Sequence, residues 1–246
     1  MEEIEKDRAA IAWLSGAWDD YVTGFPPLLP VLLVQAAISS GSFFLMHRYH
    51  SMLYAVPYIL LVVTPVSTGS ALVYITMARG GRARLRDLFS AFPVYHRAIA
   101  ISLWLGCLTL GGMLALVLPG VIIYLTYCFS EYALVDRRTG IKGSFALSRV
   151  ITEGWKRRLI PIFLLMLLVN FFAPDIVEVT GSFKAPAVSL DLKPWNLTGA
   201  LLKSLVFLPW LSLAMARAYN FLLIVPGTAA GPLTGPLTGA QPPSNM

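Results

Sequence analysis

Long uninterrupted apolar blocks constrain the fold of this chain more than any other feature of its sequence. Hydrophobic residues make up 57% of the 246 residues and charged residues only 13%, whereas a soluble domain carries about 25% charged residues. In lipid the backbone must satisfy its own hydrogen bonds, so a block that spans hydrocarbon is a helix unless strands close into a barrel. The blocks are runs of Leu, Val and Ile without the two-residue alternation of a barrel. We therefore predict an all-α, polytopic transmembrane bundle.

Six blocks approach the length of about 20 residues that a helix needs to cross a bilayer. The third and fourth are separated only by Leu118-Pro119-Gly120, a turn signal that predicts a tight helical hairpin. Prolines inside the second, fifth and sixth blocks predict kinks or local breaks, at which neighbouring helices bond the freed carbonyls. The predicted spans are residues 25–46, 52–78, 98–117, 120–135, 159–173 and 199–218. Together they form a six-helix transmembrane domain over residues 25–225.

The two ends of the chain differ from this domain in composition. Residues 1–24 are polar with a sparse apolar stripe that fits one helix face, and their Trp and Tyr residues favour the headgroup level. We predict an interfacial N-terminal helix there, with no cleavable secretory signal. Residues 226–246 repeat Gly-Pro-Leu-Thr and end in a Pro-rich stretch, a composition that predicts a disordered tail. Cys107 and Cys128 both lie in apolar blocks, where small buried hydrophobes are expected instead of a disulfide.

The distribution of Lys and Arg predicts the orientation. The 79–97 and 136–158 loops hold 12 of the 19 basic residues, and loops rich in Lys and Arg stay on the cytoplasmic side. The opposite face carries only Arg48, Lys184, Lys193 and Lys203. We expect a multi-pass protein of a prokaryotic inner membrane with both termini in the cytoplasm.

Both basic loops also carry apolar residues at helical spacing. Leu85, Leu88, Phe89 and Phe92 follow an i, i+3, i+4, i+7 pattern, and Ile141, Phe145, Ile151 and Trp155 approximate a similar stripe. Short amphipathic interfacial helices are predicted in each loop, and their shared pattern suggests a repeat of helix pairs. Each basic residue near anionic lipid contributes about 1 kcal/mol. Alternatively, the charges only fix topology. The candidate lipid- or partner-binding residues are Arg82, Arg84, Arg86, Arg97, Arg137, Arg138, Lys142, Arg149, Lys156, Arg157 and Arg158.

A few polar residues fall inside the predicted spans. Glu131 is a functional candidate because ionisable groups at membrane depth are costly; the alternative is that it pairs with a loop arginine. Thr64 and Thr68 belong to a 64–70 segment beside Pro65 that either lines a polar pocket or packs closely. Asn170 is the remaining candidate, with interhelical hydrogen bonding as its ordinary role.

Enzyme signatures are absent from the sequence. His47 and His50 are the only closely spaced histidines, and no carboxylate or cysteine cluster adjoins them, so we expect no metal site. No phosphate-binding glycine loop or nucleophile elbow is present, and no cofactor is expected. The +6 net charge is concentrated in the two loops beside the membrane, which disfavours nucleic acid as a partner.

Residues 112–168 carry a series of short motifs: Leu118-Pro119-Gly120, Ala133-Leu134-Val135-Asp136, Gly140, Phe145-Ala146-Leu147-Ser148 and Gly154-Trp155. With these motifs the segment resembles a group of prokaryotic six-helix membrane proteins related to the membrane domain of glycerophosphodiester phosphodiesterases. The resemblance implies six helices and a cytoplasmic 136–158 loop. This sequence has no counterpart of the catalytic phosphodiesterase module, and the resemblance transfers no chemistry to it.

These observations favour a non-enzymatic accessory or scaffold protein that engages membrane lipids, anionic ones in particular, through its basic loops. A protein partner or a second copy of the chain would suit the same surface. The alternative is a small transporter or channel with a site near Glu131 and the 64–70 segment. A polar cavity that reaches into the membrane beside these residues would favour the alternative, whereas a packed apolar centre would exclude it.

Overall fold

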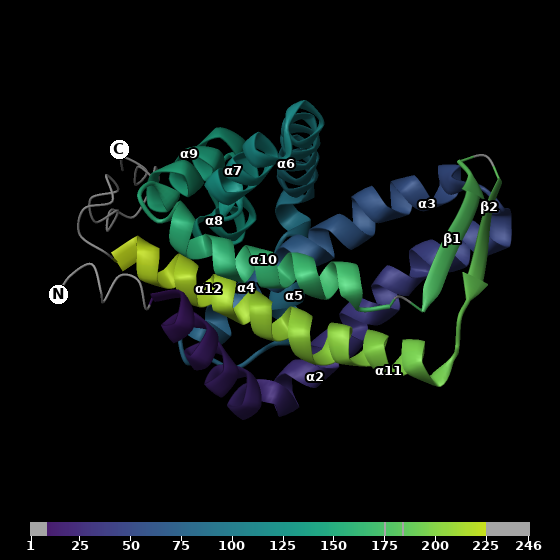
Figure 1. Cartoon of the computed structure of the whole chain (residues 1–246), viewed down its shortest axis with the longest axis horizontal. Helices are drawn as coiled ribbons and strands as arrows, with labels where there is room; N and C mark the ends of the chain where they lie inside the picture. The colour runs from purple at the N-terminus through teal and green to yellow at the C-terminus, as the bar shows by residue number, and fades with distance from the viewer. Residues whose placement is uncertain (1–8, 175, 184, 225–246) are drawn as a thin grey trace, which may run out of the picture.

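The computed structural model describes residues 9–174, 176–183 and 185–224. Most of these residues are helical, which confirms the predicted helical class at that level (Figure 1). The predicted 226–246 tail and residues 1–8 lie outside the described residues. In chain order the elements are α2 (Ala9–Tyr49), α3 (Met52–Tyr58), η1 (Ile59–Val63), α4 (Thr64–Ala78), α5 (Leu85–Leu88), η2 (Phe92–Val94), α6 (Tyr95–Ala115), α7 (Val117–Tyr127), α8 (Ser130–Arg137), α9 (Ile141–Thr152), α10 (Lys156–Phe172), β1 (Val177–Ser182), β2 (Ala185–Leu190), α11 (Pro194–Leu202), η3 (Lys203–Phe207) and α12 (Leu208–Ile224).

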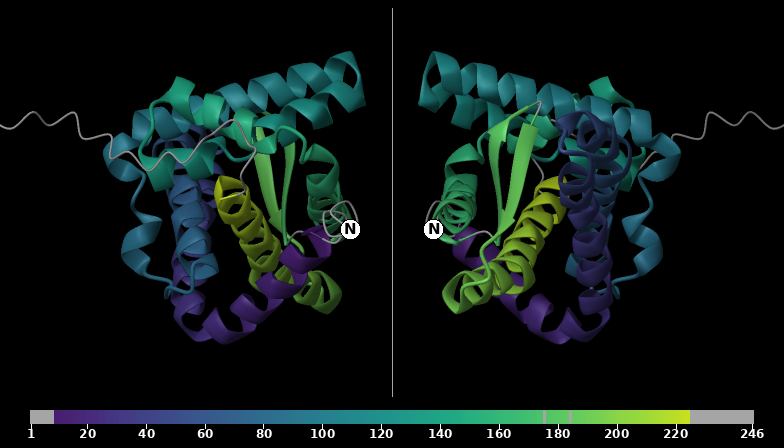
Figure 2. Two further views of the ribbon diagram at one scale, coloured as in Figure 1. Left: turned by 90° about the vertical axis from the view of Figure 1, so that its left-hand side faces the viewer. Right: turned by 90° about the vertical axis from the view of Figure 1, so that its right-hand side faces the viewer.

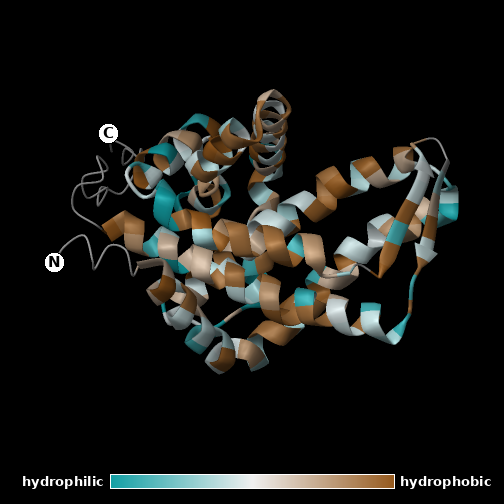
Figure 3. Cartoon of the chain, viewed as in Figure 1, coloured by the Kyte–Doolittle hydropathy of each residue, from teal (hydrophilic) through white to brown (hydrophobic). Residues whose placement is uncertain are grey.

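Five helices among the described residues are long and apolar enough to cross a membrane. The predicted fifth span corresponds to α10, whose apolar part covers residues 159–172. At 1.5 Å per residue this part extends about 21 Å, less than the hydrocarbon thickness of about 30 Å. Figure 3 shows hydrophobic residues along the long helices and hydrophilic residues mainly toward the ends of the molecule. The five helices are Ala9–Tyr49, Met52–Ala78, Leu85–Ala115, Val117–Arg137 and Pro194–Ile224.

Helix α2 runs without interruption through the predicted boundary between residues 24 and 25. Figure 2 shows it bent into a V, and the three prolines inside it remove the backbone bonds that keep a helix straight. Its first part packs against α12, so that Trp13 and Tyr21 are only 5% and 6% exposed. The Trp210 indole N–H also donates to the Leu14 carbonyl at 2.9 Å. This segment is therefore held in the bundle by α12.

The predicted helical hairpin is present, but its turn lies earlier than expected. Leu116 is extended between α6 and α7, whereas Pro119 and Gly120 belong to the first turn of α7, where a missing N–H costs nothing. A Cβ on Gly112 would lie 2.8 Å from the Gly120 Cα, so the two helices meet through glycine. The hairpin extends sideways, across the direction of the other long helices (Figure 2).

Two long helices contain π-helical segments, η1 and η3. Pro209 follows η3 and lacks the N–H that would bond the Leu205 carbonyl four residues earlier. The Tyr21 hydroxyl of α2 donates to that carbonyl at 2.7 Å. A neighbouring helix thus supplies the hydrogen bond that proline removes.

The helix formed by α7 and α8 is broken at Cys128-Phe129. The Ser148 hydroxyl of α9 donates to the Thr126 carbonyl at 2.9 Å and accepts from the Phe129 N–H at 3.2 Å. Thr152 also lies within hydrogen-bonding distance of the Thr126 carbonyl, at 3.1 Å. The break is therefore satisfied by hydroxyl groups of α9.

The segment after α10 departs from the all-α prediction. Strands β1 and β2 form an antiparallel hairpin in which Val179 pairs with Val188. The Met52 N–H donates to the Phe183 carbonyl at 3.3 Å, so the hairpin is tied to the start of α3. An isolated two-stranded hairpin is only marginally stable. This contact with α3 links the hairpin to the rest of the fold, and such a distant contact leaves no signal in the sequence of the strands.

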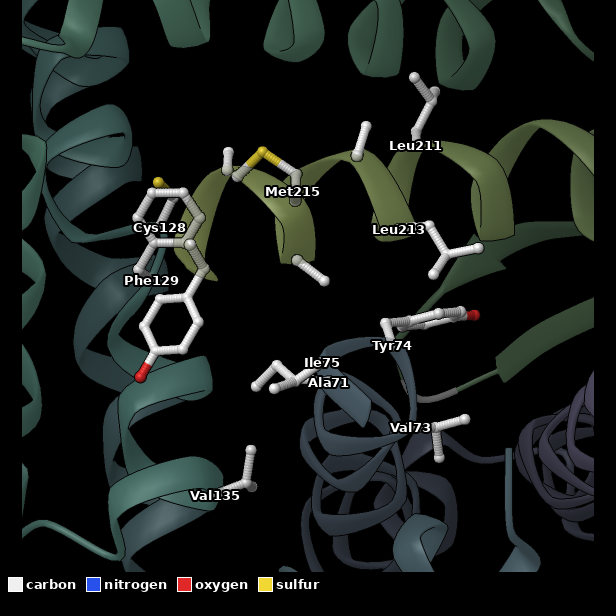
Figure 4. Close-up of a cluster of buried hydrophobic side chains, with 14 of the residues drawn as sticks. Ala71, Val73, Tyr74, Ile75, Cys128, Phe129, Val135, Leu211, Leu213 and Met215 are labelled. Atoms are coloured by element: carbon white, nitrogen blue, oxygen red, sulfur yellow. The ribbon is translucent and has the colours of Figure 1, made fainter. Parts of the chain in front are cut away.

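The apolar core lies where α4, α8 and α12 meet. Figure 4 shows Ile75 of α4, Val135 of α8 and Leu213 of α12 among the side chains gathered there. Phe129 and Tyr219 are fully buried, with ring centroids 5.7 Å apart. This core fixes the relative positions of the helices that surround the cavities described below.

Candidate functional site

The 79–97 loop does not contain the predicted amphipathic helix. Helix α5 is a single turn, and only Leu88 of the predicted stripe is fully buried, while Leu85 and Phe89 are 43% and 41% exposed. Pro93 lacks the N–H needed to continue a helix. A Cβ on Gly69 would lie 2.0 Å from the Leu88 carbonyl oxygen, so the missing side chain of Gly69 allows the loop to lie directly on α4.

The 136–158 loop does contain a helix, α9, with one buried and one exposed face. Its buried face includes Leu147 and Ile151 together with Ser144, Ser148 and Thr152. Ile141 and Phe145 of the predicted stripe are only partly buried. Because the two basic loops differ in secondary structure, the structure gives no support to the predicted repeat.

The basic side chains of the two loops are mostly exposed. Arg97, Lys156 and Arg158 are partly buried, and the Arg158 guanidinium lies 4.8 Å from the centre of the Trp155 ring. The other eight candidates are exposed: Arg82, Arg84, Arg86, Arg137, Arg138, Lys142, Arg149 and Arg157.

Asp136 joins the beginnings of both loops. Its carboxylate accepts two hydrogen bonds from Arg79, at 2.6 and 2.9 Å, and one from the Tyr219 hydroxyl at 3.2 Å. Arg79 also donates to Asn220 at 3.0 Å, and Arg137 lies 3.4 Å from the carboxylate. The bonds to Asp136 raise the pKa of the Arg79 guanidinium above its ordinary value. The ends of α4, α8 and α12 are thus tied together by charge.

Glu131 lacks the arginine partner that was considered for it. Its carboxylate accepts a hydrogen bond from the Ser102 hydroxyl of α6 at 2.6 Å, and no cation acts on it within the described part of the chain. The loop arginine that reaches this region, Arg79, binds Asp136 instead.

The Glu131 carboxyl group lies on the wall of a cavity of about 290 Å³ between α4, α8 and α12. A second cavity of about 420 Å³ lies between α2, α4 and α12, with Gln35, Ser39 and Ser204 on its wall. Both cavities are lined by Ser67, Ser70, Tyr74 and Ser212, so they adjoin. Polar groups that line the first are Glu131, Ser67, Ser70, Ser212, Tyr74, Tyr124 and Tyr132.

The other predicted intramembrane candidates do not line these cavities. Thr64 donates to the Ile59 carbonyl within its own helix, and Thr68 is fully buried with no partner for its hydroxyl. Asn170 is exposed and donates to the Met166 carbonyl. Of the 64–70 segment, Ser67 and Ser70 face the cavities, because helical periodicity turns positions three apart to the same side.

Sequence reasoning missed most of the residues that share the cavity wall with Glu131. Ser212 carried no signal, because a single serine in an apolar block is ordinary. Tyr74, Tyr124 and Tyr132 were indistinguishable from the other aromatic residues of the apolar blocks. A pattern of polar residues every three to four positions in α4 was the one available clue, at Ser67 and Ser70.

A third cavity of about 490 Å³ lies between α2 and the 79–84 loop, lined by Asp20 and Arg82 among others. The Asp20 carboxylate already forms an ion pair, because Arg217 donates hydrogen bonds to both of its oxygens, at 2.6 and 2.8 Å. Across the described ranges, no group of three or more potential metal ligands occurs. Glu131 is therefore distinctive as a carboxylate that faces a cavity without a cation.

Comparisons with protein-family models, with curated proteins and with solved structures find no match to this chain. The resemblance carried by residues 112–168 therefore stays a prediction.

Proposed function

We propose that this chain is a small membrane transporter whose substrate site is the cavity at Glu131. The observation that carries the proposal is the unpaired Glu131 carboxyl group, within the Val117–Arg137 span, on the wall of a polar cavity. An unpaired charge at that depth is costly, so the carboxylate favours either a cationic substrate or a proton. Alternation between the two would couple substrate movement to proton movement.

The break between α7 and α8 and the π-helical segments η1 and η3 support the transporter proposal. Irregular backbone at membrane depth is tolerated where it lines a cavity or is buried in protein, and π-bulges are frequent at functional sites. The break at Cys128-Phe129 comes just before Glu131, and Ser204 of η3 lines the adjoining cavity. Transporter binding sites commonly use discontinuous helices of this kind.

We also propose six crossings, with both termini on the cytoplasmic side of a prokaryotic inner membrane. Trp13 near the start of α2 packs against Phe221 near the end of α12, with ring centroids 5.7 Å apart. Both ends of the described chain thus lie together, at the opposite end from the β-hairpin (Figure 1). An even number of crossings keeps these ends on one side, and in this proposal α10 supplies the sixth crossing despite its short apolar part.

A proton-flux assay tests the transporter proposal. The chain is reconstituted into vesicles that contain a pH-sensitive dye and the small-molecule fraction of bacterial cytosol, and a pH gradient is imposed. Proton movement should exceed that of protein-free vesicles and disappear in Glu131→Gln. Glu153→Gln is the matched control, because Glu153 is exposed after α9 and should leave the flux unchanged. Equal flux in Glu131→Gln and the parent chain would contradict the proposal.

Binding of anionic lipid is a second candidate function, favoured by one observation. Exposed Arg82, Arg84 and Arg86 lie beside exposed Leu85 and Phe89, a combination that suits the boundary between lipid headgroups and acyl chains. The same surface could bind a protein partner or a second copy, and lipid is the ligand that this mixture fits best.

A lipid-dependence measurement tests this second candidate. The melting temperature of the purified protein is recorded in detergent with added phosphatidylglycerol or phosphatidylcholine. Phosphatidylglycerol should stabilise the parent chain more than phosphatidylcholine, and the triple variant R82Q/R84Q/R86Q should lose the difference. Arg48→Gln, at the opposite end of the chain's long axis, should keep it. Equal stabilisation of the parent chain by both lipids would reject lipid binding.

A further inference from the structure

We infer that the substrate of the Glu131 cavity is a small organic monocation, such as an alkylated ammonium compound; this inference rests on the proposed transport function. The cavity combines one carboxyl group with aromatic and polar neighbours: Glu131, Tyr74, Tyr124, Tyr132 and Ser212. A single carboxylate balances a single positive charge. Aromatic rings attract organic cations through the negative potential of their faces.

The composition of the cavity wall argues against a metal ion. Calcium takes 6 to 8 oxygen ligands and magnesium demands about six in an octahedron. Glu131 is the one acidic residue on the cavity wall, and the remaining oxygens are serine and tyrosine hydroxyls. The other residues of the wall are Ala71, Leu105, Cys128, Met166 and Met215. Such a wall suits a cation whose own surface is largely hydrocarbon.

The charge and size of the cavity restrict the class of substrate further. A carboxylate on the wall repels anions, and a neutral ligand would leave that charge without compensation. A volume of about 290 Å³ lies at the low end of ordinary ligand sites, which range over about 300–1,000 Å³. The adjoining cavity offers Gln35 and Ser39, so a larger cation could extend between α2 and α4.

Ser102 positions the Glu131 carboxylate in the proposed site. Its hydroxyl donates to Glu131 from α6, which belongs to the least buried of the five candidate spans, Leu85–Ala115. A carboxylate oxygen accepts more than one hydrogen bond, so this donor holds the carboxylate in place while a cation approaches. Ser102 is a positioning residue: it touches Glu131 and not the substrate.

Tetraethylammonium binding to the detergent-solubilised full chain, measured by isothermal titration calorimetry, tests the inference. Glu131→Gln should weaken binding at least tenfold, and Tyr124→Leu about fivefold through loss of a cation–π contact. Tyr124→Phe retains the ring and should weaken binding less than Tyr124→Leu does, and Glu153→Gln should bind like the parent chain. Sodium and potassium at equal concentration should not compete. No binding by the parent chain, or competition by sodium, would overturn the inference.

A second measurement on the parent chain covers the case in which a variant fails to fold. Hydrophobic carbodiimides modify protonated carboxyl groups within membranes, and mass spectrometry locates the adduct. Tetraethylammonium should protect Glu131 from modification. Modification of Glu131 at an unchanged rate would overturn the inference, whatever the behaviour of the variants.

The flux assay distinguishes failure of this inference from failure of the transport function. The cytosolic fraction is passed over a cation exchanger, and sodium and potassium are restored before it is loaded into vesicles. Loss of the Glu131-dependent flux, with recovery on adding tetraethylammonium, is the expected result. Undiminished flux after depletion would leave the transport function standing and refute the organic cation. Absence of Glu131-dependent flux with the complete fraction would instead refute the transport function.

Discussion

Replacing Asp136 with asparagine tests whether charge at the ends of three helices holds the bundle together. The substitution keeps the shape of the side chain and removes its negative charge. It replaces a carboxylate that accepts two bonds from Arg79 and one from Tyr219 with an amide whose NH₂ group opposes the guanidinium. Because Arg79 leads into one basic loop and Asp136 into the other, the perturbation acts on both.

The expected loss of stability follows from the burial of the pair. The Asp136 side chain is 7% exposed and that of Arg79 is 46% exposed. Removing one partner of a fully buried pair costs about 3–5 kcal/mol, and an exposed pair contributes about 0–1 kcal/mol. Since water can solvate half of the Arg79 side chain, we expect an intermediate loss of about 2 kcal/mol, a roughly 30-fold change in the folding equilibrium.

Unfolding of the purified protein in mixed detergent micelles, followed by tryptophan fluorescence, measures this loss. Asp191→Asn is the matched control, because Asp191 pairs at 3.0 Å with Lys193, whose side chain is 77% exposed, and the variant should show little change. The variant Arg79→Gln and the double variant complete a cycle. If the two residues act through each other, the double variant should be little less stable than either single variant.

The pH dependence provides an independent check. The pKa of Arg79 is raised by its bonds to Asp136, so its contribution to stability is complete below the ordinary arginine pKa and falls only as pH rises through the raised value. The effect of Asp136→Asn should therefore be constant between about pH 6 and 9. An Asp136→Asn variant as stable as Asp191→Asn, or a coupling energy near zero, would refute the reasoning.

Two further substitutions test the packing. Gly69→Ala should destabilise the protein by about 1–3 kcal/mol, because the added Cβ would meet the Leu88 carbonyl oxygen at 2.0 Å, whereas Gly106→Ala has open space and should be neutral in the same unfolding assay. Tyr21→Phe should cost about 1 kcal/mol by removing the hydrogen bond to the Leu205 carbonyl; a loss no larger than that of the same change at an exposed tyrosine would contradict this role.

Much of the helical content could be predicted from the sequence, because it follows from local chemistry. An apolar block in lipid has no alternative to a helix, whichever neighbours it meets. The positions of breaks were less predictable. Pro119-Gly120 looked like the turn of the hairpin, yet proline fits the first helical turn equally well, and the turn fell at Leu116. Local signals leave such a choice open, and contact between helices decides it.

The candidate site was predictable only in part. Glu131 stood out because an acidic residue in an apolar block is rare. The residues around Glu131 could not be predicted, because they come from distant parts of the chain: Ser67 from α4, Tyr124 from α7 and Ser212 from α12. Within the 64–70 segment, Ser67 and Ser70 line the cavities, whereas the predicted Thr64 and Thr68 do not. Which face of a helix turns inward depends on its neighbours.

In the two basic loops, too, one part could be predicted from the sequence and the other depends on tertiary contacts. Their charge, and hence their predicted side of the membrane, depends on composition alone. Their folds do not, because Leu88 is buried only where Gly69 admits it, and α9 uses serine and threonine hydroxyls to satisfy a break in another helix. Sequence thus determined the long apolar helices and the uneven distribution of charge, since both depend on each residue's own affinity for water. Tertiary structure decided that Arg79 binds Asp136 and leaves Glu131 facing a cavity, because pairing depends on which helix ends meet.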